Sequence, residues 1–273
     1  MQIDVFSSRP YGGNPVAVVL DGTDLSDEDM QRVARWTNLS ETTFVLPATA
    51  PEADYQLRIF TPRSELPFAG HPTLGSARAW LVNGGTPRRT GRIVQECGAG
   101  LVPVRLGNDR LAFAAPPRLR DGTVDEAYLT RLVAAFGITR EQVVAHQWVD
   151  NGPGWAVLQL ASAHEVLALE PDLSLIPGAM VGAIGAHPEG SSHHFELRTF
   201  APGAGVPEDP ACGSMNAAVG QWLTATGAAP LSYRVSQGGR LGHAASIEIS
   251  AEPDGTVWVS GATTVCIQGS ITV

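Results

Sequence analysis

The sequence of 273 residues predicts an α+β protein of two pseudo-symmetric domains, each a curled, mainly antiparallel sheet around a central buried helix. Three observations lead to this prediction. They are an internal repeat, short Val/Ile/Leu-rich segments bounded by Gly and Pro, and two nearly uncharged helical segments at matching places. The repeat has a period of about half the chain, which indicates a duplicated domain, because solenoid repeats run to about 20–50 residues.

The internal repeat consists of short segments that recur in the same order about 140 residues further along the chain. They are Arg58–Pro62, Ala69–His71, Trp80–Leu81 and Gln95, repeated at Arg198–Pro202, Ala211–Ser214, Trp222–Leu223 and Gln237. The repeat predicts one domain over residues 1–116 and a second over 117–261, divided near Ala115–Arg118, where two prolines interrupt any strand. Residues 262–273 are predicted as a final strand that can return to the first domain.

The strands are predicted where apolar runs lie between Gly and Pro residues. In chain order they span residues 2–7, 15–20, 55–60, 101–106, 110–114, 155–160, 194–200, 246–250 and 256–260. Residues 25–38 predict an amphipathic helix. Ser26 is its N-cap, Asp29 stands three residues later, and an apolar stripe follows, made up of Met30, Val33 and Ala34.

The two helices that follow the matched segments have a different pattern. Residues 73–82 carry one charge and residues 214–223 carry none. A helix that is apolar or small nearly all round is buried on every side, which favours a sheet curled around it in each half. No G-x-G-x-x-G or G-x-x-x-x-G-K-[ST] motif points to a nucleotide-binding fold.

Composition and charge narrow the classes of function. The formal net charge is −9 and no block of Lys and Arg occurs, which disfavours nucleic acid and anionic membranes as partners. The first six residues are typical of a strand and not of a signal peptide, and no apolar run reaches the roughly 18 residues that span a bilayer. Three widely spaced cysteines indicate a reduced, cytoplasmic protein without a disulfide framework or structural zinc.

The candidate chemistry lies at the starts of the two buried helices. Gly70-His71-Pro72 opens the first, with proline predicted at the first helical position, and Gly213-Ser214 opens the second. Helix N-termini offer free N–H groups and partial positive charge, so they bind carboxylates. A small organic anion is therefore a candidate ligand even for an acidic protein. The alternative is that both segments are ordinary helix starts.

Four residues beside these starts are candidates for acid–base chemistry, each with a structural alternative. His71 can transfer protons near neutral pH or serve the structure alone. Asp209 can be a site carboxylate or lie exposed in a turn, and Ser214 can bind substrate or only cap the helix. Glu41 lies in an apolar, hydroxyl-rich stretch that would raise its pKa, as a general base requires, but an exposed Glu would look the same in the sequence.

Cys212 stands next to a predicted helix N-terminus, which would lower the pKa of its thiol. The sequence leaves open whether this thiol is functional or buried and inert. The histidines show no metal-ligand spacing, and no G-x-S-x-G motif points to serine hydrolysis.

Together these residues give the chain a resemblance, from end to end, to the phenazine-biosynthesis PhzF-like family. The matching segments are Asp4–Phe6, Gly12–Val18, Ser40–Val45, Arg58–Pro62, Glu65–Gly75, Pro207–Ser214 and Gln237–Gly239. The Gly-His-Pro-Thr and Glu-Asp-Pro-Ala-x-Gly-Ser motifs are the most specific of them.

The resemblance implies a diaminopimelate-epimerase-like fold with a site in the cleft between its domains, often as a homodimer. It implies an isomerase that needs no metal or organic cofactor and moves a proton and a double bond in a small unsaturated or cyclic amino or hydroxy acid. The family's catalytic glutamate corresponds to Glu41. The other catalytic residues correspond to His71, Asp209 and Ser214. The remaining helix-start residues are expected to bind the substrate: Gly70, Pro72, Thr73, Cys212 and Gly213.

One residue departs from the family pattern. Residues 211–214 are Ala-Cys-Gly-Ser, whereas the family pattern at this place is similar to Ala-Thr-Gly-Ser. The related epimerases and proline racemases carry a catalytic cysteine at the position of Cys212. Their second cysteine would fall near Ala69, which has no acid–base chemistry, so a two-thiol racemase is not expected. An epimerase or racemase that uses Cys212 with Glu41 is left open. So is a non-catalytic protein that binds a small acid.

Overall fold

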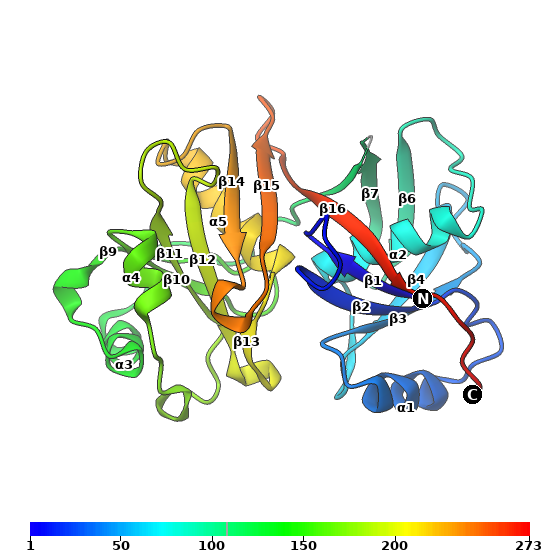
Figure 1. Cartoon of the computed structure of the whole chain (residues 1–273), viewed down its shortest axis with the longest axis horizontal. Helices are drawn as coiled ribbons and strands as arrows, with labels where there is room; N and C mark the ends of the chain where they lie inside the picture. The colour runs from blue at the N-terminus through cyan, green and yellow to red at the C-terminus, as the bar shows by residue number, and fades with distance from the viewer. Residues whose placement is uncertain (108) are drawn as a thin grey trace. The chain divides into compact units, whose positions relative to one another are not determined.

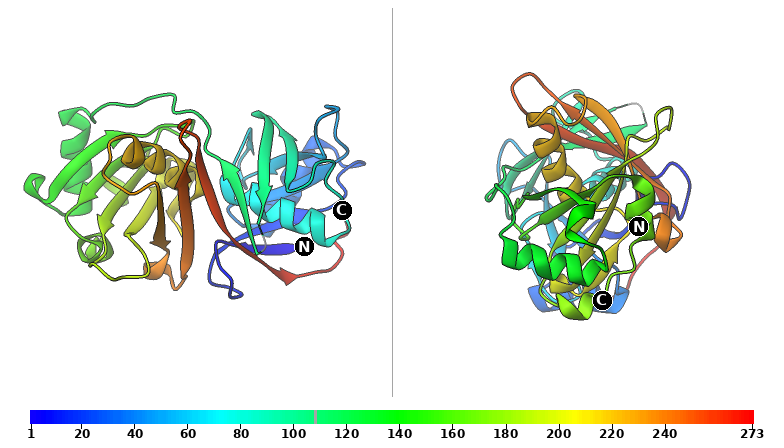
Figure 2. Two further views of the ribbon diagram at one scale, coloured as in Figure 1. Left: turned by 90° about the horizontal axis from the view of Figure 1, so that it is seen from above. Right: turned by 90° about the vertical axis from the view of Figure 1, so that its left-hand side faces the viewer.

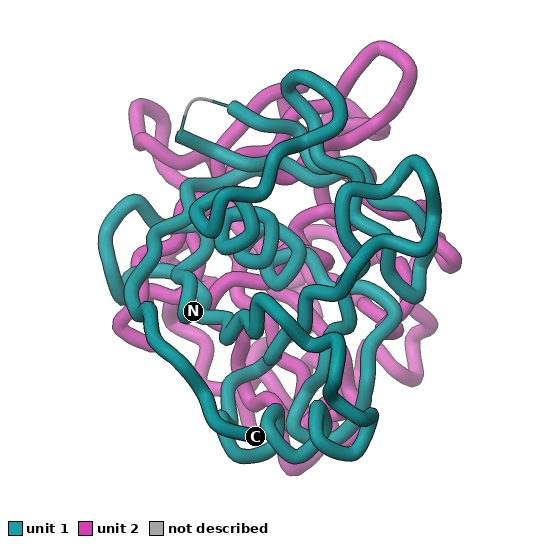
Figure 3. Tube along the Cα trace, turned by 90° about the vertical axis from the view of Figure 1, so that its right-hand side faces the viewer, with its two compact units in different colours: residues 1–114, 260–273 teal, residues 115–259 magenta. Residues whose placement is uncertain are grey.

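A computed structural model of the chain describes residues 1–107 and 109–273 (Figure 1). They divide into two compact units, which Figure 3 shows in two colours. Unit 1 comprises Met1–Ala114 with Ser260–Val273, and unit 2 comprises Ala115–Val259. Both ends of the chain therefore belong to unit 1 (Figure 2). The protein is a mixed α+β protein in which strands predominate, as the sequence predicted.

Unit 1 is built on a sheet in the order β1-β2-β3-β4-β6-β7-β8. The β2–β3 and β4–β6 pairs are parallel, and the other neighbouring pairs are antiparallel. β5 pairs with β4, and β1 also pairs with β16. The elements of this unit are β1 (Gln2–Val5), β2 (Asn14–Val19), α1 (Asp27–Thr37), β3 (Thr42–Leu46), β4 (Tyr55–Phe60), β5 (Glu65–Leu66), α2 (Gly70–Val82), β6 (Arg92–Cys97), β7 (Gly100–Leu106) and β8 (Arg110–Ala114).

Helix α1 forms where its capping pattern predicted it. The Ser26 side chain accepts a hydrogen bond from the Asp29 backbone, and the Asp29 side chain accepts one from the Ser26 backbone. The apolar stripe is buried against Phe44 and Phe60, and the helix ends where Asn38 adopts a left-handed conformation.

Helix α2 is buried on nearly all sides, as its lack of charge predicted. It packs against strands β1 to β4 and β8. Gly75 allows this close approach, because a Cβ there would lie 2.3 Å from Val16 Cγ1. The helix begins at Gly70, two residues before the proline that was predicted to open it. Its N-cap is Ala69, so Pro72 is the third helical residue and not the first. Proline fits there because the N–H groups of a first helical turn have no partner within the helix.

Unit 2 repeats this order of pairings, with β9-β10-β11-β12-β14-β15-β16 as neighbours and β13 on β12. Here β10–β11 and β12–β14 are the parallel pairs. The strands are β9 (Val143–Trp148), β10 (Ala156–Leu160), β11 (Val181–Ala186), β12 (Phe195–Ala201), β13 (Val206–Asp209), β14 (Ser232–Gln237), β15 (Ala245–Ala251) and β16 (Val257–Ile267). The helices are α3 (Glu126–Phe136), α4 (Ala163–Ala168), α5 (Gly213–Ala225) and the 3₁₀ turns η1 (Arg140–Gln142), η2 (Leu173–Leu175), η3 (Pro202–Ala204) and η4 (Gly239–Leu241).

Several elements were missed or misplaced in the prediction. Helix α3 was missed, although Asp125 caps its start and a buried stripe of Leu129, Leu132 and Phe136 runs along it. Strand β1 ends at Val5, before the predicted residue 7, because Phe6 has a positive φ of 70°. The predicted strands at 256–260 and 262–273 are one strand that ends at Ile267. Also absent from the predicted strands and helices were α4, β3, β5, β6, β9, β11, β13 and β14.

Candidate active site

Unit 1 brings Glu41 and His71 together. Glu41 directly precedes β3, and His71 is the second residue of α2. His71 Nε2 lies 3.3 Å from Glu41 Oε2, and the two side chains are 4% and 15% exposed. The alternative in which Glu41 is an exposed surface residue is therefore wrong.

His71 is held in its neutral form. Burial lowers its pKa to about 3, against a smaller effect from a hydrogen bond to the Pro15 backbone. Nε2 makes no hydrogen bond to a described residue, so Nδ1 is the atom that donates to the Pro15 carbonyl. Nε2 then carries a lone pair toward Glu41 Oε2. A proton on either atom converts the contact into a hydrogen bond, so the pair can share one proton.

Unit 2 places Asp209 at the end of β13, just before α5. Burial raises the pKa of Asp209 to about 6, while hydrogen bonds from the Ala211 N–H and the Cys212 side chain act in the opposite direction. The Ala211 N–H donates to Asp209 Oδ1 at 2.9 Å. Asp209 is thus not the freely exposed turn carboxylate of the structural alternative.

Ser214 lies inside the first turn of α5. The N-cap is Cys212, which makes no side-chain cap, so the interpretation of Ser214 as an N-cap is wrong. Ser214 Oγ instead accepts a hydrogen bond from Trp155 Nε1 at 3.1 Å and lies 3.5 Å from Cys212 Sγ. Asn151 Nδ2 donates to the Ser214 backbone oxygen at 2.9 Å.

The two helix starts are open in the same way. The N-caps Ala69 of α2 and Cys212 of α5 provide no side-chain hydrogen bond to the helix. The first N–H groups of each helix are therefore left for another partner, and the helix dipole favours an anion there. Gly70 and Gly213 are the first residues of the two helices, in the segments predicted to open them.

Sequence reasoning missed the residues that hold these side chains. Pro15 binds His71, and Trp155 binds Ser214. Both stand where the second strand of their unit begins, because β2 opens at Asn14 and β10 at Ala156. The apolar segments 17–19 and 156–158 of those strands resemble each other, and at their offset Trp155 corresponds to Val16, the neighbour of Pro15. The repeat therefore brings the two positions near each other without aligning them.

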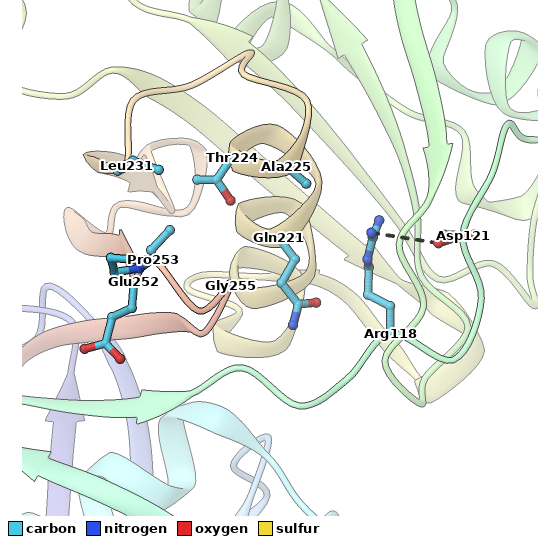
Figure 4. A pocket seen from close by; sticks show the side chains of 10 residues that line it. Arg118, Asp121, Gln221, Thr224, Ala225, Leu231, Glu252, Pro253 and Gly255 are labelled. Atoms are coloured by element: carbon cyan, nitrogen blue, oxygen red, sulfur yellow. Dashed lines mark ion pairs between the residues drawn. The ribbon is translucent and has the colours of Figure 1, made fainter.

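Cavities in unit 2 lie elsewhere. One of about 540 Å³ adjoins the C-terminal end of α5, with Arg118, Gln221 and Glu252 among its lining residues (Figure 4). Another of about 570 Å³ is lined in part by Arg120 and Trp148. None of the predicted site residues lines either cavity. Within residues 1–107 and 109–273, no group of three His, Cys, Asp or Glu side chains is arranged to hold a metal ion. No helix in the same residues is long and apolar enough to cross a bilayer.

Comparison with known proteins gives the family. A family model described as "Phenazine biosynthesis-like protein" matches residues 3–270. "Antisense-enhancing sequence 1" of Schizosaccharomyces pombe is 39% identical over 286 residues, which cover 98% of this chain and 96% of the relative. A "trans-2,3-dihydro-3-hydroxyanthranilate isomerase" of Pseudomonas aeruginosa is also 39% identical, over 78% of this chain and 74% of the relative.

Solved structures agree on the fold. A predicted epimerase from Pseudomonas aeruginosa matches with a TM-score of 0.81 and 25% identity, covering 100% of this chain and 98% of the other. A probable proline racemase from Agrobacterium radiobacter matches with a TM-score of 0.63 and 14% identity, covering 100% and 92%. The chain therefore belongs to the family of phenazine biosynthesis-like proteins, as the motifs of both halves predicted, and it is an enzyme of the isomerase class.

Proposed function

We propose that the protein is a cofactor-independent isomerase that moves a proton and a double bond in a small unsaturated or cyclic amino or hydroxy acid. Glu41 is the acid–base residue. The observation that carries the proposal is the buried contact of 3.3 Å between Glu41 Oε2 and the Nε2 atom of a neutral His71. The relatives named trans-2,3-dihydro-3-hydroxyanthranilate isomerase support this class of reaction.

The proposed reaction needs no oxidant or co-reactant. Glu41 removes a proton from an activated C–H bond, the electron pair left behind shifts the double bond, and the proton is returned to a different carbon. Between these steps the proton on Glu41 Oε2 is shared with His71 Nε2, and burial of both atoms slows its loss to water. A positioned base of this kind contributes on the order of 10²–10⁴-fold to the rate.

We propose that the substrate's carboxylate binds at an open helix start and that Asp209 and Ser214 contact its polar groups. Gly70, Pro72, Thr73, Cys212 and Gly213 are the proposed binding residues. The lack of a side-chain cap at α2 and α5 supports this assignment, since an anion satisfies the free N–H groups.

We further propose that the fold is diaminopimelate-epimerase-like, with two pseudo-symmetric domains, and that the enzyme is a cytoplasmic homodimer. The matching order of strand pairings in units 1 and 2 supports the duplication. The three cysteines form no disulfide with one another, which agrees with a reducing compartment. Analytical ultracentrifugation of the whole chain tests the dimer.

Proton NMR in D₂O tests the proposed reaction. The substrates are trans-2,3-dihydro-3-hydroxyanthranilate and a panel of small unsaturated amino acids. We expect the wild-type enzyme to shift a double bond and incorporate deuterium, and Glu41→Gln to do neither. Glu52→Gln, which changes an exposed carboxylate, is the matched control and should behave as wild type. Equal turnover by Glu41→Gln would refute the assignment of the base.

A second candidate is an epimerase or racemase that uses Cys212 with Glu41. The thiol of Cys212 at the start of α5 favours it, since this residue is 5% exposed and its side chain is hydrogen-bonded to the Asp209 carboxylate. In the same NMR experiment it predicts deuterium exchange without a shifted bond, together with loss of optical purity.

A further inference from the structure

Four side chains of unit 2 form a connected series that ends at Asp209. Trp155 Nε1 lies 3.1 Å from Ser214 Oγ, and Ser214 Oγ lies 3.5 Å from Cys212 Sγ. The Cys212 side chain in turn hydrogen-bonds the Asp209 side chain. Trp155 directly precedes β10, Asp209 ends β13, and Cys212 and Ser214 lie at the start of α5, so the series joins two parts of the folded unit and is not one local turn.

The two ends of the series determine its direction. The indole N–H of Trp155 can only donate, and the ionised carboxylate of Asp209 can only accept. Ser214 Oγ therefore accepts from Trp155, and the thiol of Cys212 donates to Asp209. The proton of the Ser214 hydroxyl is then left to point toward Cys212 Sγ, which has a lone pair to receive it.

We propose that Cys212 is a positioning residue, which donates to Asp209 and accepts from Ser214, so that it holds Asp209 ionised and keeps the Ser214 hydroxyl available as a donor. This inference rests on the proposed function for its consequence, because it assumes that Asp209 and Ser214 contact the substrate. Sulfur is a weak acceptor, so the Ser214 hydroxyl turns to a substrate oxygen at little cost.

The backbone around the series is held independently of the thiol. Gln237 Oε1 accepts from the Cys212 N–H at 3.2 Å and from Asn216 Nδ2 at 2.9 Å. Gln237 Nε2 donates to the Asp209 backbone oxygen at 2.9 Å. A change of the Cys212 side chain therefore leaves the backbone of Asp209 and Cys212 fixed. Besides the thiol, the Ala211 N–H lowers the pKa of Asp209, and two charged groups act on it, since Glu208 raises the pKa and His243 lowers it.

Infrared spectroscopy of the substrate-free protein tests the series without reference to any activity. The S–H stretching band of Cys212 is the difference between wild type and Cys212→Ala. We expect Asp209→Asn, which presents a weaker acceptor, to move this band to higher frequency. Cys97→Ala removes a thiol in unit 1 and is the control that leaves the band in place. A Cys212 band that does not respond to Asp209→Asn would overturn the proposal.

Kinetics then test the consequence, with trans-2,3-dihydro-3-hydroxyanthranilate as the probe. Cys212→Ala should lower kcat/KM by about 3- to 10-fold, the effect of one lost hydrogen bond, and move the acid limb of the pH profile upward. Cys212→Ser still donates to Asp209, so its acid limb should stay in place. Its hydroxyl oxygen accepts more strongly than sulfur and holds Ser214 back, so KM should rise by up to about 3-fold while kcat changes less. Trp155→Phe removes the donor that orients the Ser214 hydroxyl, so it should also raise KM by up to about 3-fold.

The outcomes separate the two proposals. A loss of more than about 100-fold in both Cys212→Ala and Cys212→Ser would assign the thiol to the chemistry itself, as for a catalytic acid–base group, and overturn the positioning role. An acid limb unmoved by Cys212→Ala would overturn it as well. If the probe is not turned over at all, the proposed function fails for that substrate, and the infrared result still decides the direction of the series.

Discussion

The two units begin their buried helices in the same way and surround them with different chemistry. In unit 1 the second helical residue is His71, which faces a carboxylate and is held by a backbone carbonyl. In unit 2 the second helical residue is Ser214, which accepts from an indole and adjoins a thiol. The backbone arrangement at the two helix starts is therefore the same, and only the side chains around it differ. The second helical residue, His71 or Ser214, and the group that it contacts at the start of the neighbouring strand make one start a proton acceptor and the other a hydroxyl donor.

The largest expected effect is on the catalytic rate, and it tests whether the two helix starts have different roles. Glu41→Gln removes the proposed base, so kcat/KM should fall by about 10²–10⁴-fold. Ser214→Ala removes one hydrogen-bond donor, so kcat/KM should fall by only about 10-fold. Turnover followed by NMR measures both values. Equal losses of kcat/KM in the two variants would contradict the distinction between the helix starts.

The matched arginines of the repeat give the next prediction, on stability. Arg198 is 4% exposed, pairs with both oxygens of Glu208, and also donates to the backbone oxygens of Val166 and Leu169. Arg58 makes the same fork to Glu65 closer to solvent. Arg198→Met should lower the free energy of unfolding by about 3–5 kcal/mol, because it leaves the Glu208 carboxylate, whose side chain is only 11% exposed, without its partner. Arg58→Met should cost about 1 kcal/mol or less.

Urea denaturation monitored by circular dichroism measures these two losses. Similar values for the arginine variants would mean that the difference in burial between the two forks does not govern their strength.

The helix glycines sharpen the comparison further. A Cβ at Gly75 would lie 2.3 Å from Val16 Cγ1, whereas a Cβ at Gly220 would lie 2.9 Å from Ile249 Cγ2. Overpacking costs about 1–3 kcal/mol, and Ala gains about 1 kcal/mol over Gly in a helix. Thermal unfolding should therefore show Gly75→Ala as clearly destabilised and Gly220→Ala as nearly neutral. The reverse order would contradict the tighter packing of α2.

The smallest effect concerns pH. Glu196 of β12 lies opposite Ser236 of β14. In the matching strand pair of unit 1, Gln56 of β4 occupies the place of Glu196 and lies opposite Glu96 of β6. Burial raises the pKa of Glu196 from 4.5 to about 7. Because the folded state holds the proton more tightly, this group's contribution is full below about pH 4.5 and is lost as pH rises through about 7. Glu196→Gln, which copies unit 1, should remove that decline.

Unfolding titrations of wild type and Glu196→Gln at a series of pH values measure the difference. His71 makes the free energy of unfolding rise with pH, because burial lowers its pKa. This contribution is the same in both proteins and cancels in their difference. A wild-type-minus-variant curve that is flat from pH 4 to 8 would show that Glu196 is not buried as a protonated acid.

The sequence predicted the features that local patterns encode. The capping box of α1, the buried character of α2 and α5 and the family motifs follow from residue types at short spacing. The contact between Glu41 and His71 could be expected only from the resemblance, since 30 residues separate them. The roles of Trp155 and Pro15 could not be predicted, because they arise from packing between a strand start and a distant helix. Helix α3 is different, because its cap and stripe were present in the sequence and were overlooked.

Strand β16 has a consequence for how the chain reaches its native state during synthesis. Thr264 Oγ1 donates to the Ser7 backbone oxygen, 257 positions away, and β1 pairs with the far end of β16. Unit 2 is one continuous stretch of chain, whereas unit 1 needs residues from both ends. Contacts this distant in sequence form slowly. Strand β1 leaves the ribosome before β16 and must wait for it, so unit 2 can finish folding before unit 1.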